Sequence, residues 1–236
     1  MKKRIFAALL VLLLLLCACG AEEPWQAAYR RTGQALAAQE DYGVGSIGGE
    51  WAVIGLSRSE LLKQETAQAY LQTVEDYVRS IGTVRLDHAK STENSRIILG
   101  VTAAGGDVTD IGGVNLLEGL TDMTFVSYQG LNGPIWALIA LDCGGYEIPD
   151  AQPGEAQTTR EALGIDPQKD ARFLKNGRSV LDALCDFVLD DGFYHSAELV
   201  EVNGMATEQA YYALTAYARF RDGKSRLFDM TELTAA

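Results

Sequence analysis

The stretch EVNGMATEQAYYALTAY, residues 201–217, decides the fold of this chain. Its apolar residues recur at the i, i+3, i+4 spacing of a helix with one apolar face. The stretch GLNGPIWALIALD, residues 130–142, has the same order, with an Asn-Gly pair followed by an alanine-rich apolar run. Asn132 and Asn203 occupy matching places, and Pro134 suits the first turn of a helix, where no amide partner is lost. The sequence therefore predicts two related alanine-rich helices.

The segments that precede these two helices are also similar to each other. Residues 102–120 read TAAGGDVTDIGGVNLLEGL, and residues 161–184 read EALGIDPQKDARFLKNGRSVLDAL. Each predicts the end of a helix, then a turn with Gly and Asp, then a short leucine-rich helix. A repeated helical hairpin cannot bury its apolar face alone and must stack on its neighbours. We therefore expect an all-α fold built from helical-hairpin repeats.

Further helices are predicted on both sides of these repeats. Residues 70–81 and 180–188 carry apolar side chains at helical spacing. Ser179, with Asp182 three positions later, is typical of a helix capping box. A third alanine-rich stretch begins at Trp51, and helices of this kind can approach one another closely. We expect them to be the inner helices of a curved array.

The N-terminal residues have the parts of a secretory signal peptide. Three basic residues at positions 2–4 precede twelve apolar residues at positions 5–16. Twelve residues are too few to span a bilayer as a helix, which takes roughly twenty. The sequence therefore predicts export from the cytoplasm.

Cys19 is the predicted site of lipid attachment. The sequence LCAC, residues 16–19, resembles the bacterial lipobox, in which an aliphatic residue at −3 and a small residue at −1 precede the acylated cysteine. Only Cys19 meets both conditions, because the residue before Cys17 is the large Leu16. We expect residues 1–18 to be the signal peptide and the acyl chains on Cys19 to hold the protein at the extracytoplasmic face of the cell membrane. A plain signal peptide with incidental cysteines is the alternative.

Charge and length limit the partners and the number of domains. Cleavage before Cys19 would remove three basic residues and change the formal net charge from −12 to −15. A chain this acidic repels phosphate backbones, so nucleic acid is excluded as a partner. We expect residues 19–44 to form an anchored segment with a first helix, and residues 45–236 to form one helical domain. The spacing of Cys143 and Cys185 does not decide whether they pair.

Four segments resemble the secreted bacterial, prenyltransferase-like branch of the terpenoid cyclase and protein prenyltransferase superfamily. They are GGEWAVIGLSRS at 48–59, NSRIILGVTAAGGDVTDIGGVNLL at 94–117, GLNGPIWALIALDCGGYEIP at 130–149 and EVNGMATEQAYYALTAYARFRDGKSRLFDM at 201–230. The resemblance implies an α/α toroid, a ring of inner helices surrounded by outer helices. It also implies a secreted or surface protein, in a superfamily whose members act on isoprenoids or bind cobalamin.

One difference from these relatives affects the expected ring. In the relatives, the YEIP sequence is followed by two further hairpins, whereas here AQTTRE runs directly into ALGIDP between Thr159 and Ala162. The resemblance therefore implies an incomplete α/α toroid. The arc could tighten until the exposed flanks of its helices meet, or it could stay open. We expect the open form, with a groove lined by the alanine-rich helices and by Trp136 and Tyr211.

The motifs that would indicate catalysis do not match. The cyclase acid motif Asp-x-Asp-Asp is not present around Asp190-Asp191, because Val188 and Leu189 precede this pair. The zinc pattern Asp-x-Cys is not present at Asp142-Cys143, where the two residues are adjacent. The sequence GVGSIG at 43–48 matches a dinucleotide-binding pattern, but a helical stretch precedes it where that motif needs a strand. We expect no catalytic residue, no metal site and no cofactor, and a loop at 43–48.

The aromatic residues on the alanine-rich helices are the binding candidates. If these helices line a concave surface, Trp51, Trp136 and Tyr211 could hold an apolar or flat ligand. The alternative is that they fill the core between inner and outer helices. We therefore expect a membrane-anchored lipoprotein with a non-catalytic binding role, whose partner is an apolar ligand or a protein. A toroid-type carrier or enzyme for an isoprenoid or cobalamin-type ligand is the alternative.

Overall fold

The computed structural model describes residues 22–130, 132–146, 166, 168–169 and 174–234. The predicted signal peptide at 1–18, the predicted anchor Cys19 and the junction between Thr159 and Ala162 lie outside these residues. The described elements are helices, and the β-type pairings among them are isolated bridges. The prediction of an all-α protein is confirmed at this level.

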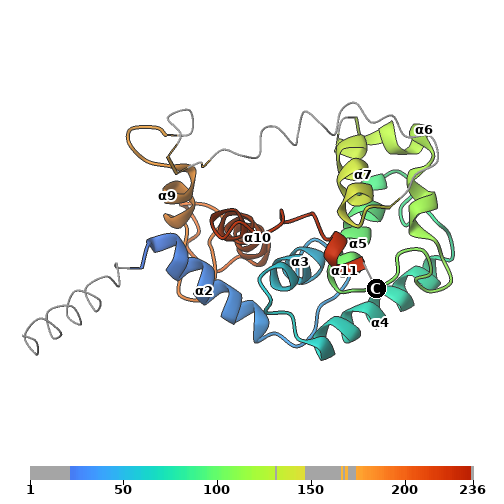
Figure 1. Ribbon diagram of the computed structural model, residues 1–236, viewed down its shortest axis with the longest axis horizontal. Helices are drawn as coiled ribbons and strands as arrows, with labels where there is room; N and C mark the ends of the chain where they lie inside the picture. The colour runs from blue at the N-terminus through green and yellow to red at the C-terminus, as the bar shows by residue number, and fades with distance from the viewer. Residues whose placement is uncertain (1–21, 131, 147–165, 167, 170–173, 235–236) are drawn as a thin grey trace, which may run out of the picture.

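Figure 1 shows how the helices are arranged along the described parts of the chain. The longer ones are α2 (Pro24–Ala37), α3 (Glu50–Arg58), α4 (Gln64–Ile81), α5 (Ser91–Ala103), α7 (Asn132–Cys143) and α10 (Gly204–Arg221). The shorter ones are η1 (Leu116–Leu120), α6 (Met123–Val126), η2 (Ser127–Gln129), α9 (Val180–Cys185) and α11 (Thr231–Thr234).

The local signals in the sequence correspond to helix ends in the structure. Ser179 caps α9, because its hydroxyl accepts the Asp182 N–H while the Asp182 carboxylate accepts the Ser179 N–H. The side chain of Asn203 accepts the Ala206 N–H and caps α10. Gly223, just after α10, has a φ of 65°, a left-handed conformation that glycine adopts without a steric penalty.

Four helices form a central row. α10 packs on α3, α3 packs on α5, and α5 packs on α7. The central position of α5 explains its composition, because every residue from Asn94 to Ala103 is buried. Figure 1 shows α2 and α4 along the outer edge of this row, where α2 contacts α10 and α3, and α4 contacts α5. Within the described residues, α7 and α10 do not pack closely on each other.

Two groups of buried apolar side chains hold these layers together. The larger group fills the space between α3, α4, α5 and α7, and includes Ile54, Leu56, Tyr70, Ile97, Leu99 and Leu116. The smaller group lies between α2, α9 and α10, and includes Trp25, Leu181, Phe193, Leu214 and Tyr217. The helix that was expected to belong to an anchored N-terminal segment, α2, therefore packs into the same body as the predicted domain.

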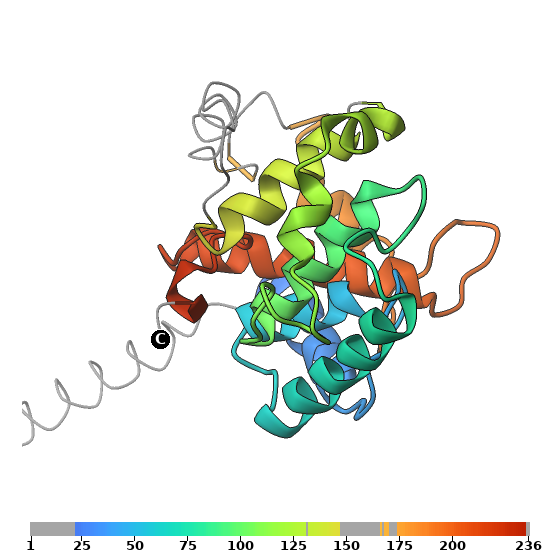
Figure 2. The same cartoon turned by 90° about the vertical axis from the view of Figure 1, so that its right-hand side faces the viewer.

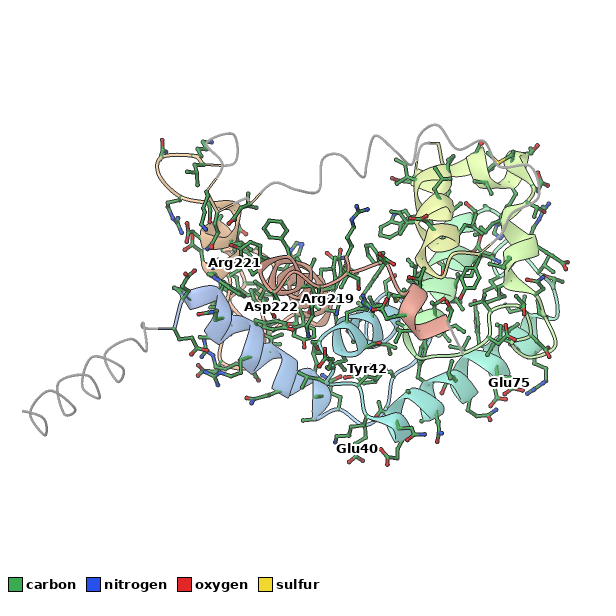
Figure 3. All side chains as sticks on the ribbon, viewed as in Figure 1. Glu40, Tyr42, Glu75, Arg219, Arg221 and Asp222 are labelled. Carbon is green, nitrogen blue, oxygen red and sulfur yellow. The ribbon has the colours of Figure 1, made fainter. Side chains whose placement is uncertain are left out.

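The segment after α10 returns to the central row. The Met230 N–H donates to the Cys143 carbonyl at 2.7 Å, and the Met230 side chain is fully buried. Figure 2 shows this C-terminal segment beside α7. Arg219, in the last turn of α10 (Figure 3), donates from Nε to the Ser225 carbonyl at 2.7 Å. Cys143 is buried and carries a free thiol, as does Cys185, so the two do not form a disulfide.

Candidate functional site

A cleft of about 250 Å³ lies where α3, α5 and α7 begin, and it opens to solvent. The N-terminal parts of these three helices, the loop before α3 and the end of η2 supply its lining. The lining residues are Ser46, Trp51, Thr92, Glu93, Arg96, Gln129, Asn132 and Trp136. Two of the three predicted binding candidates, Trp51 and Trp136, are therefore brought together at one site from distant parts of the chain.

An ion-pair network around Arg96 forms the polar side of the cleft. Arg96 Nε donates to Glu50 Oε2 at 2.9 Å, and Arg96 Nη2 donates to Glu93 Oε2 at 2.6 Å. Arg96 Nη1 donates to Ser46 Oγ at 3.1 Å and also to Glu93. The Glu50 side chain is completely buried and accepts the Gly45 backbone N–H as well. One guanidinium group thus fixes α3, α5 and the loop before α3 relative to one another.

Burial and neighbouring charges act in opposite directions on this network. Burial raises the pKa of the Glu50 carboxyl, and the adjacent Arg96 counteracts part of that rise. Burial alone would lower the pKa of Arg96, but the carboxylates of Glu93 and Glu50 outweigh it, and the net pKa is raised. Arg96 therefore stays charged, and its two carboxylate partners more than balance its charge.

Aromatic rings form a row behind the cleft. The ring centroids of Trp51 and Trp136 are 5.3 Å apart, and those of Trp51 and Tyr212 are 5.4 Å apart. The ring of Phe228, from the returning C-terminal segment, meets Trp136 edge-on at 6.1 Å. These side chains connect α10, α3 and α7, and Trp51 and Trp136 also line the cleft. The two tryptophans therefore serve both packing and the cleft wall.

Tyr211 does not line this cleft or a groove, contrary to the expectation from the sequence. Its side chain is fully buried, stacks on Tyr29 with ring centroids 5.5 Å apart, and lies 2.7 Å from Ser59 Oγ through its hydroxyl oxygen. Consecutive helical residues point about 100° apart, so only one of Tyr211 and Tyr212 can face Trp51. Tyr212 is the residue that faces Trp51, whereas Tyr211 packs against Gly33 and Gly55.

The glycine-rich segment at 43–48 is a loop between α2 and α3, as predicted. Its backbone amides are already engaged by carboxylates from two helices. The Gly45 N–H donates to Glu50, and the Gly48 N–H donates to Glu208 Oε1 at 2.5 Å. A phosphate group would have to compete with these two carboxylates for the same donors. The loop therefore supports the interface of α3 and α10.

The other predicted features concern catalysis, metals and the membrane. Asp190 is fully exposed and pairs with Arg31 at 3.1 Å. Across the described part of the chain, no three His, Cys, Asp or Glu side chains come close enough to hold a metal ion. None of the helices that the structure describes combines the length and apolar composition that a bilayer-crossing helix requires.

Comparison of this chain with protein-family models, curated protein sequences and solved structures gave no match. The resemblance to the prenyltransferase-like toroid proteins therefore rests on the four sequence segments quoted above.

Proposed function

We propose that this protein is an extracytoplasmic lipoprotein, anchored through Cys19, whose helical domain binds a ligand without transforming it chemically. The observation that carries the binding role is the meeting of Trp51 and Trp136 beside the Arg96 network in one cleft. Concave sites that combine aromatic walls with a few fixed polar groups are typical ligand sites. The anchor rests on the sequence at 16–19.

We further propose that the helices form an incomplete α/α toroid. The order of packing supports this proposal, because α10, α3, α5 and α7 form an inner row and each follows a more peripheral helix in the chain. The turns before two peripheral helices are also alike. Ile111 and Val114 form an isolated bridge just before η1, and Lys175 and Arg178 form another just before α9. These are the two segments that the sequence predicts to be repeats.

Binding of a small group is better supported than the alternative, a toroid-type enzyme or carrier for an isoprenoid or cobalamin-type ligand. Chemistry on isoprenoid diphosphates needs concentrated positive charge to stabilise the leaving group. The cation of the cleft, Arg96, is instead paired with two carboxylates. The cleft volume of about 250 Å³ is also below the roughly 300–1,000 Å³ usual for pockets that enclose a whole small molecule. It suits one ring-sized group better than an isoprenoid chain or a corrin ring.

Replacement of the two N-terminal cysteines tests the anchor. Cys19→Ala should abolish incorporation of radiolabelled palmitate and release the protein from membranes, or block its maturation. Cys17→Ala should leave both labelling and membrane association unchanged, because Cys17 would leave with the signal peptide. Loss of labelling in Cys17→Ala alone would show that the wrong cysteine has been assigned.

A further inference from the structure

The cleft presents several neutral hydrogen-bonding groups that have spare capacity. Gln129 Oε1 accepts the Thr92 backbone N–H at 3.2 Å, which leaves the Gln129 amide N–H groups to donate. The Ser46 hydroxyl accepts from Arg96 and still has its own proton to donate. Within the described residues, the Asn132 side chain and the Thr92 hydroxyl make no hydrogen bond. The cleft can therefore both donate hydrogen bonds to a ligand and accept them from it.

The charges of the cleft do not favour an ionic ligand. Arg96 uses Nε, both Nη1 hydrogens and one Nη2 hydrogen on Glu50, Glu93 and Ser46. Arg96 has one Nη2 hydrogen left, so an anion would gain a single donor and would lie beside the carboxylate of Glu93. Arg96 offsets one of the two carboxylates, and the positive ends of the α3 and α5 dipoles offset part of the remaining negative charge, so a cation gains little here. The positive ends of the α3 and α5 dipoles are likewise covered by Glu50 and Glu93, which lie in the first turns of these helices.

A purely apolar ligand fits the cleft no better. It would cover the four neutral polar side chains without giving them partners, which is costly for each group. The aromatic wall nevertheless calls for a ligand with an apolar face. The C–H groups of a saturated ring carry small positive charges, and these complement the negative face of an indole ring.

The geometry points to a neutral sugar ring as the ligand of this cleft, with the ring against Trp51 and Trp136 and the hydroxyl groups on Ser46, Thr92, Gln129 and Asn132. The inference rests on the proposed binding function and specifies its ligand class. The cleft has a volume of about 250 Å³ and opens to solvent, which suits one monosaccharide unit, either free or at the end of a glycan.

The test is a titration of the full-length protein, purified in a detergent without a sugar headgroup, followed by tryptophan fluorescence and calorimetry. The neutral probes are D-glucose, D-galactose, D-mannose and N-acetyl-D-glucosamine, each also as its methyl glycoside to imitate the end of a glycan. D-Glucuronate, D-glucosamine and farnesol represent anionic, cationic and apolar ligands. We expect at least one neutral sugar to bind about tenfold or more tightly than the charged sugars. Tighter binding of the glycoside than of the free sugar would identify a glycan end as the source.

Variants of the cleft decide whether such binding occurs at the proposed site. Trp136→Ala should weaken sugar binding about tenfold or more, and Gln129→Ala and Asn132→Ala about threefold to tenfold. The two polar variants keep the test valid if Trp136→Ala does not fold. Trp25→Phe changes the tryptophan outside the cleft and should leave the affinity unchanged.

The possible failures of the two proposals can be told apart. Binding of glucuronate or farnesol that depends on Trp136 would overturn the sugar assignment and leave the binding function intact. Sugar binding that is the same in all three cleft variants would place the sugar elsewhere and overturn the inference. If no neutral sugar binds, the inference is wrong. If no probe of any class binds in a Trp136-dependent manner, the proposed binding function loses its support as well.

Discussion

Glu208 is a carboxyl group that the fold has buried beside the glycine-rich loop. Its side chain is 4% exposed, and Oε1 accepts the Gly48 N–H, while Oε2 has no hydrogen-bond partner among the described residues. Burial, and to a smaller extent the nearby Glu50, outweighs the hydrogen bonds from the loop amides and raises the pKa of the Glu208 carboxyl to about 7. The folded protein therefore holds a proton on Glu208 at pH values where the unfolded chain has lost it.

This burial makes stability depend on pH in a defined direction. Because the folded pKa lies above the unfolded value of 4.5, Glu208 does not reduce stability below about pH 4.5, and it costs stability as the pH rises toward 7. We expect the free energy of unfolding to fall by about 2–3 kcal/mol between pH 5 and pH 8, measured by urea denaturation. Glu50, whose pKa is also raised by burial, acts in the same direction.

The matching variant is Glu208→Gln, which is neutral at every pH and keeps the acceptor for the Gly48 N–H. It should flatten the fall in stability between pH 5 and pH 8, whereas Glu65→Gln, at an exposed position of α4, should not. A wild-type protein whose stability rises over this range, or a Glu208→Gln variant with the same slope as wild type, would refute the assignment.

At the level of helices, the sequence predicts what depends on near neighbours. The helices at 70–81 and 201–217 were predictable because apolar spacing is repeated within each segment. Which of Tyr211 and Tyr212 faces Trp51 was not predictable. Both residues are aromatic, and their positions depend on glycines in α2 and α3. The pair Glu93 and Arg96 could have been found from its i, i+3 spacing. The burial of Glu50 against Arg96 could not have been found from the sequence, because it depends on the packing of α3 on α5.

The packing of α2 and α3 around Tyr211 can be tested with alanine substitutions. A Cβ at Gly33 would lie 2.5 Å from Tyr211 Oη, and a Cβ at Gly55 would lie 2.7 Å from Tyr211 Cδ1. Alanine would favour each helix by up to about 1 kcal/mol. Overpacking of a closed core costs about 1–3 kcal/mol, so we expect Gly33→Ala and Gly55→Ala each to give a net loss of stability in thermal or urea unfolding.

A second substitution separates the two sites. Tyr211→Phe removes the hydroxyl with which the new methyl group of Gly33→Ala would clash. Adding Tyr211→Phe should therefore recover part of the stability lost in Gly33→Ala and none of that lost in Gly55→Ala. Gly43→Ala is the control, because a Cβ there would meet only the Gly48 carbonyl, at 3.8 Å. If Tyr211→Phe restores the same amount of stability to the Gly33→Ala and Gly55→Ala variants, this packing is wrong.

For the whole molecule, side chains and the returning C-terminal segment occupy the space that the sequence assigned to an open groove. The row of rings from Tyr212 through Trp51 to Trp136 ends on Phe228, which belongs to that segment. The sequence predicted the helices that carry these rings but not this filling, because Phe228 meets Trp136 only through the return of the chain after α10. The cleft that remains lies at the helix N-termini and is more polar than the predicted groove.

Arg58 holds this C-terminal segment on the central row, and its removal is the test at this scale. Arg58 is 2% exposed, and its Nη2 lies within hydrogen-bonding distance of Ser225 Oγ, the Arg226 carbonyl and the Asp229 carbonyl, at 2.8, 3.0 and 2.7 Å. Its Nη1 also pairs with Glu232. Arg58→Ala would remove these hydrogen bonds and leave a cavity where the buried Arg58 side chain packs. We therefore expect a loss of about 2–3 kcal/mol in the free energy of unfolding.

The matched control is Arg79→Ala, which removes an exposed arginine that pairs with Glu75 and Asp76 on its own helix and should cost less than about 1 kcal/mol. Release of the C-terminal segment should also withdraw Phe228 from Trp136 and expose Met230. Arg58→Ala should therefore shift tryptophan emission to the red and bind an apolar dye under conditions where the protein is still helical, whereas Arg79→Ala should do neither. If the two arginine variants melt and fluoresce alike, the C-terminal segment is not what closes the space between α7 and α10, and another part of the chain must fill it.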